Sequence, residues 1–125
     1  MSLGDGIYPG AIAAADLSNK QYHFMRLVGT TERSVNQASL DTSTELVGIL
    51  VNKPAANEHA SIQQLGETFL IAGGALDANA YLTTNSSGRA AAAGSGDMVG
   101  ARAVVAAAGD GDKIRVVACI PWRLA

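Results

Sequence analysis

The chain has little cysteine, few aromatic residues and no excess of positive charge, and each shortage excludes a class of protein. Cys119 is the only cysteine among 125 residues, so the chain can form no internal disulfide and no zinc site built from several thiolates. Aromatic residues make up 5% of the sequence, and the net charge is −2. Because lysine and arginine are scattered rather than clustered, we expect no nucleic-acid binding.

Long apolar runs are also missing. An apolar patch spans residues 11–15, but Asp16 follows it directly and no basic residue precedes it. The patch is too short for the core of a signal peptide and far too short to cross a membrane. We therefore expect synthesis in the cytoplasm and no membrane partner.

The apolar residues that are present are small. They make up 48% of the chain, yet alanine supplies much of this share, so each buried side chain removes little area from water. A chain of this length is expected to form one domain with one core. Such a core would gain from contact with further subunits.

Short apolar segments alternate with glycine, asparagine, aspartate and proline from Leu46 to Ile120. This rhythm predicts an all-β fold, either a small β-sandwich or a β-barrel of short strands. An earlier strand is expected over 21–28, whereas the polar stretch 30–44 favours a loop or an exposed edge hairpin. The expected later strands lie at residues 46–51, 60–62, 68–71, 81–84, 99–105 and 113–120.

Particular residues refine these strands. Gly48 interrupts an apolar strand, which indicates a bulge or the close approach of another backbone. Residues 85–88 and 109–112 carry turn signals. The expected strands on either side of the second turn, 99–105 and 113–120, are predicted to form a hairpin. In the last strand, alternation places Ile114, Val116, Ala118 and Ile120 on one face.

The first 20 residues follow no periodic pattern, so we divide the chain into an N-terminal arm, 1–20, and a β-rich domain, 21–125. The arm is either a frayed terminus or a segment that docks on a partner. The second interpretation rests on apolar residues that a free tail has little reason to carry in water. The candidate contact residues are Ile7, Tyr8, Pro9, Ile12 and Leu17.

Motifs for catalysis or cofactors are not convincing. Residues 94–100 nearly match a dinucleotide-binding fingerprint, but a strand is expected to follow where that motif needs a helix. Asp110 and Asp112 alternate as in a calcium loop but lack its other ligands, and neither His23 nor His59 has zinc spacing. We expect no enzyme activity, no metal site and no cofactor.

Two further residues have alternative interpretations. Cys119 lies inside an expected strand, which favours a small buried hydrophobe over a reactive thiol. Trp122 could cap the open end of a barrel or anchor an interface.

The turn and strand motifs resemble those of the tailed-bacteriophage capsid decoration proteins, also called cement proteins. The resemblance covers about residues 46–120. Its segments are Val47-Gly48-Ile49-Leu50, residues 52–58, Gly66, residues 72–75, 82–84, 88–90, 99–103 and 114–116. Asn57 and Asn79 stand where that family commonly has glycine, and asparagine is the best replacement in a left-handed turn.

This resemblance implies a virion protein that binds the outer surface of an icosahedral capsid and stabilises it. It implies the major capsid protein as partner, a homotrimer at local threefold positions, and a location on the capsid exterior. The alternative is a carbohydrate-binding or adhesive surface module. Such a module would need an aromatic platform, whereas Tyr8, Tyr22, Tyr81 and Trp122 are dispersed in the sequence.

Overall fold

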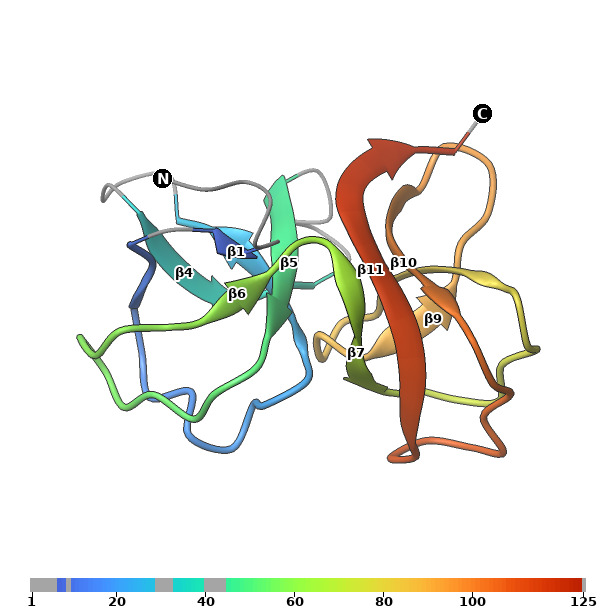
Figure 1. The fold of residues 1–125 in the computed structure, drawn as a ribbon, viewed down its shortest axis with the longest axis horizontal. Helices are drawn as coiled ribbons and strands as arrows, with labels where there is room; N and C mark the ends of the chain where they lie inside the picture. Colours follow the sequence, from blue (N-terminus) through green and yellow to red (C-terminus); the bar gives the residue numbers. More distant parts are fainter. Residues whose placement is uncertain (1–6, 9, 29–32, 40–44, 125) are drawn as a thin grey trace.

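A computed structural model describes residues 7–8, 10–28, 33–39 and 45–124 of the protein (Figure 1). Over these ranges the chain forms eleven strands and no α-helix, which confirms the predicted all-β class. The strands form two sheets that lie side by side, one from each half of the chain. No described helix is long and apolar enough to span a membrane.

The first sheet contains six strands in the order β1-β6-β5-β3-β4-β2. Its pairs are antiparallel except β2 with β4. The sheet curls, because Ile12 in β2 bridges to His59 in the loop that leads to β6. The strands are β1 (Ile7–Tyr8), β2 (Ile12–Ala13), β3 (Phe24–Leu27), β4 (Ser34–Gln37), β5 (Leu46–Leu50) and β6 (Ile62–Gln63).

The second sheet contains five strands in the order β7-β11-β10-β8-β9. It also curls, because Ala72, just after β7, forms a bridge to Ala90 in β9. Together the two curled sheets fit the predicted small barrel or sandwich. The strands are β7 (Gly66–Ile71), β8 (Tyr81–Thr84), β9 (Ala90–Ala92), β10 (Met98–Ala103) and β11 (Lys113–Arg123).

Two apolar clusters fill the interior, and β5 contributes to both. Leu46 and Ile49 face the second sheet, where they join Phe24 in one cluster. Val47 and Leu50 face the inside of the first sheet and belong to the other. Because both faces are covered, all five residues of β5 are buried, as expected of a central strand.

The predicted irregularity at Gly48 is confirmed. The pairing of β3 with β5 shifts there: Met25 lies opposite Gly48, but Arg26 lies opposite Leu46. A Cβ atom on Gly48 would lie 2.7 Å from the carbonyl oxygen of Gln63, so another backbone does approach closely. This bulge explains why Leu46 and Ile49, three residues apart, share one face.

Left-handed turns occur where the sequence indicated them. Asn57 and Asn79 have φ values of 69° and 70°, which confirms the expected glycine-like role of both residues. Gly88 and Gly111 have φ values of 76° and 91° in the turns that connect β8 to β9 and β10 to β11. Both turns join antiparallel neighbouring strands, which confirms the hairpin predicted for β10 and β11.

Two expectations about strands are wrong. Residues 34–37 are neither a loop nor an exposed edge but form β4, where Val35 is fully buried, because β2 pairs with β4 and covers its other side. Ile120 does not share the inner face of β11 and is 53% exposed. The cause is a register shift: Ala118 pairs with Ala101, but Trp122 pairs with Val99.

The segment before β3 ties the two sheets together. The amide of Tyr22 donates to the carbonyl of Leu50 in the first sheet, and the carbonyl of Tyr22 accepts from Ile71 in the second. The amide of Phe24 donates to the carbonyl of Gly88 at 2.7 Å. Tyr22 holds a φ of 65°, a left-handed conformation that is uncommon for a bulky residue.

Candidate functional site

Three of the predicted contact residues near the N-terminus, Ile7, Tyr8 and Ile12, lie in strands of the first sheet. Ile7 and Tyr8 form β1 and pair with Gln63 and Ile62 of β6. Tyr8 is half-buried against the core, and the guanidinium carbon of Arg33 lies 5.4 Å from its ring centroid. Pro9 and the side chain of Ile7 lie outside the described residues.

Ile12 and Leu17 have different environments. Ile12 is 36% exposed, so its side chain can reach a partner. Leu17 is 2% exposed and belongs to the core of the first sheet, and its amide donates to the carbonyl of Pro54 at 2.9 Å. Leu17 therefore has a structural role. The sequence-based division assigns residues 1–20 to an arm, yet within it β1 and β2 pair in the first sheet, and Ala11, Ala13 and Leu17 are buried in the core of that sheet.

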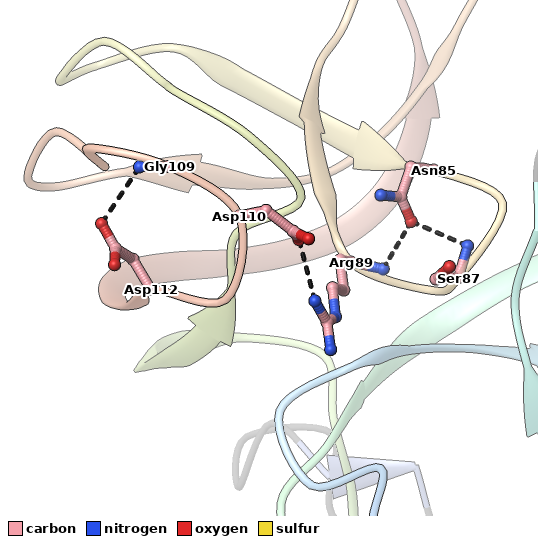
Figure 2. Close-up of polar contacts among 6 residues, drawn as sticks. All are labelled: Asn85, Ser87, Arg89, Gly109, Asp110 and Asp112. Carbon is pink, nitrogen blue, oxygen red and sulfur yellow. Dashed lines mark hydrogen bonds and ion pairs between the residues drawn. The ribbon is translucent and has the colours of Figure 1, made fainter.

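Polar side chains hold the turns at one end of the second sheet (Figure 2). The Asn85 side-chain oxygen accepts hydrogen bonds from the amides of Ser87 and Arg89. Asp112 accepts from the amide of Gly109, whereas Asp110 forms an ion pair of 2.8 Å with Arg89. The two aspartates therefore serve separate partners, which is the arrangement of a solvated turn.

The described residues contain no group of three or more histidines, cysteines or acids that could hold a metal ion. His23 is 5% exposed, and burial lowers its pKa, with smaller contributions from the positive charges of Lys20 and Arg89. Burial raises the pKa of Cys119, so its thiol stays protonated near neutral pH and is a weak nucleophile. His59 lies in a different, exposed loop.

Exposed aromatic and basic side chains gather on the outer face of the second sheet. Arg102 in β10 pairs directly with Tyr81 in β8 on one side and with Val117 in β11 on the other. Directly paired residues point to the same face, so these three form a row across the sheet. Trp122 joins the row through an edge contact with Tyr81, with 5.4 Å between ring centroids.

Each basic residue of this face lies over an aromatic ring. The Arg102 guanidinium carbon is 5.3 Å from the Tyr81 centroid, and the Lys113 ammonium nitrogen is 5.0 Å from that of Phe69. Arg115 also lies over Phe69, at 5.8 Å. We call this surface the cation–aromatic face; its members are Phe69, Tyr81, Arg102, Lys113, Arg115, Val117 and Trp122.

Sequence reasoning missed this face. Tyr81 and Trp122 were treated as dispersed, yet the sheet brings them into contact. Trp122 is 40% exposed and its ring contacts that of Tyr81. A signal was present, because Lys113, Arg115 and Val117 alternate with inward-facing residues in β11.

Comparison with known proteins identifies the fold. No protein-family model matches the chain, and no curated protein matches its sequence. Among solved structures, the chain is similar to the N base of the head fiber protein gp8.5 of bacteriophage phi29, known from a crystal structure. The TM-score is 0.66 and the sequence identity 19%, over 86% of this chain and 89% of that chain. At this identity the likeness shows a shared fold across nearly the full length of both chains.

Proposed function

We propose that the protein is a structural component of a bacteriophage virion, which binds the outer surface of the icosahedral head and stabilises it as a cement protein. The observation that carries this proposal is the shared fold with a base segment of a phage head fiber, over most of both chains. The turn motifs of residues 46–120 support it independently, because they resemble those of decoration proteins.

The proposed partner is the major capsid protein, and the proposed assembly is a homotrimer on the capsid exterior. A self-associating protein would bury apolar side chains that the single chain leaves in water, such as Leu65, Val105 and Ile120, each at least 40% exposed. Among the residues predicted to contact the capsid, Tyr8 and Ile12 stay as candidates, since neither is fully buried.

Binding to heads tests this function directly. Purified protein is mixed with expanded heads of the phage that encodes it, prepared from a mutant that lacks the protein, and the heads are pelleted. We expect saturable co-pelleting, extra density on the outer surface by cryo-electron microscopy, and heads that resist heat better than undecorated ones. Protein that stays in the supernatant at every concentration would refute the proposal.

A carbohydrate-binding surface module is the second candidate, because the contact between Tyr81 and Trp122 supplies two adjacent exposed rings. Their planes meet at 83°, so a sugar could stack on one ring at a time. A glycan array would reveal such binding, and Trp122→Ala should then abolish it. Retention of a glycan by the Trp122→Ala variant would remove this candidate site.

A further inference from the structure

Charge is unevenly distributed between the second sheet and the rest of the chain. Strands β10 and β11 contain four of the nine basic residues and none of the eleven acidic ones. Since the whole chain has a net charge of −2 and these two strands contribute +4, the remaining residues carry −6. Three of the four basic residues, Arg102, Lys113 and Arg115, lie on the cation–aromatic face, and Glu67 in β7 pairs directly with Val117 on the same face. The face therefore carries three cations and one carboxylate, a local positive surface on an acidic protein.

The positive charges on this face are held in place but not neutralised. Arg102 and Lys113 contact aromatic rings, and a ring orients a cation without cancelling its charge. Arg115 has an acidic partner, Glu67, at 3.6 Å, but both side chains are more than half exposed, so this pair is weak. Cations that are already held in place lose little conformational freedom when an anionic group binds them.

Apolar surface lies among these charges. Tyr81 and Trp122 are each 40% exposed and Val117 is 44% exposed, although they belong to the interior strands β8 and β11 of the sheet. Arginine, tyrosine and tryptophan are also the residues that dominate binding energy at protein interfaces. The face thus combines an apolar centre with positive charges, and its complement is an apolar surface that carries carboxylates.

We propose that the cation–aromatic face docks onto a carboxylate-bearing protein surface of the capsid shell. This inference rests on the proposed function and adds a contact beyond Tyr8 and Ile12. Symmetric pairing of two copies through this face is unfavourable, because it would bring together six cations and only two carboxylates, the two copies of Glu67. A nucleic acid is a poor occupant, since the −6 carried by the other residues repels a long polyanion.

Charge reversal on the face is the test. Arg102→Glu and Lys113→Glu are compared with Lys53→Glu, which makes the same change in net charge at an exposed loop residue between β5 and β6. Head binding is measured by pelleting at low and high salt, with thermal melting as a check on folding. The Arg102 side chain also donates a hydrogen bond to the Asn79 carbonyl, so Arg102→Glu removes a structural contact as well as a charge. Lys113→Glu is included because it changes the charge without removing such a hydrogen bond.

We expect each face variant to bind heads about tenfold more weakly or worse, as when a central interface charge is reversed, while Lys53→Glu binds like wild type. Wild-type binding should weaken as salt increases. Folded face variants that occupy heads as fully as Lys53→Glu would overturn the inference and leave the proposed function intact.

Other outcomes overturn it differently. Wild-type protein that does not bind heads refutes the proposed function, and the shell contact falls with it. If sedimentation without heads shows that Arg102→Glu dissociates an oligomer, the face binds the acidic side of a second copy instead. If the face variants lose retention of single-stranded DNA that wild type binds, the partner is a nucleic acid.

Discussion

The substitution Gly48→Ala tests the packing of β5 against β6 in the first sheet. A Cβ atom at this position would lie 2.7 Å from both the Gln63 carbonyl oxygen and the Ile62 Cγ2 atom. Gly48 does not have a positive φ, so the effect is steric and not a matter of backbone conformation. Because one of the two obstacles is backbone, a change of side-chain rotamer cannot relieve the contact.

The size of the effect follows from the distance that must open. The distance from the added Cβ atom to the Gln63 carbonyl oxygen has to widen from 2.7 Å to the 3.4 Å at which ordinary van der Waals contact begins. The backbone pairing between β5 and β6 must be distorted to allow this. Overpacking of a well-filled interior typically costs about 1–3 kcal/mol. Since the obstacle is a paired strand, we expect the upper end of this range, about 2–3 kcal/mol of unfolding free energy.

Urea denaturation followed by circular dichroism measures this loss. The matched control is Gly74→Ala, where an added Cβ meets nothing within 4 Å. The control should be neutral or should stabilise the protein by about 0.4–1 kcal/mol through the unfolded chain. A loss of 2–3 kcal/mol corresponds to a midpoint shift of roughly 1 M urea or more at an ordinary slope. Equal stability of the two variants would refute the argument that Gln63 excludes a side chain at Gly48.

Three further results are expected. Burial lowers the pKa of His23 below its ordinary 6.5, so below this pH the unfolded chain takes up a proton that the folded chain does not hold. The free energy of unfolding should therefore fall as the pH drops below about 6.5. Thermal melts between about pH 5 and 8 should show that His23→Gln flattens this dependence. A slope that His23→Gln leaves unchanged would assign it to another group. In urea titrations, Leu17→Ala should lower the free energy of unfolding by about 2–5 kcal/mol and Ile12→Ala by much less, because of the two only Leu17 is fully buried. Equally small losses for both variants would indicate that this segment is an arm separate from the core. Because partial burial raises the pKa of Cys119, a thiol reagent at pH 8 should label it more slowly in the folded protein than in urea, and equal rates in both would contradict the raised pKa.

The strands and turns with local signals could be predicted from the sequence. In β11, Ile114 and Val116 face the core as the alternation predicted, because each inward residue is followed by an outward one. Asn57 and Asn79 adopt left-handed turns for a reason contained in the residue itself, since asparagine tolerates a positive φ. The prediction failed at Ile120, where the pairing with β10 shifts and no local pattern announces the shift.

Features that depend on distant partners could not be predicted. β1 and β2 are two residues long, and Ile7 finds its partner at Gln63, so nothing near residue 7 indicates a strand. The cation–aromatic face is assembled from four strands, each of which supplies only one to four of its residues. Only the register, which sets Arg102 beside both Tyr81 and Val117, brings them together.

The division of the strands between two halves of the chain has a consequence for synthesis. Every strand pair of the first sheet lies within residues 7–63, and every pair of the second lies within 66–124. The first sheet can therefore form on the ribosome before the second exists, and at roughly 5–20 residues per second the wait lasts roughly 3–12 s. During this interval the side of Phe24 and Ile49 that later meets the second sheet has no cover. A nascent chain that stalls once residue 63 has emerged from the ribosome would keep the strand pairs of the first sheet and still expose this apolar surface to its neighbours on the same messenger RNA. Slow translation of the second half therefore favours co-aggregation.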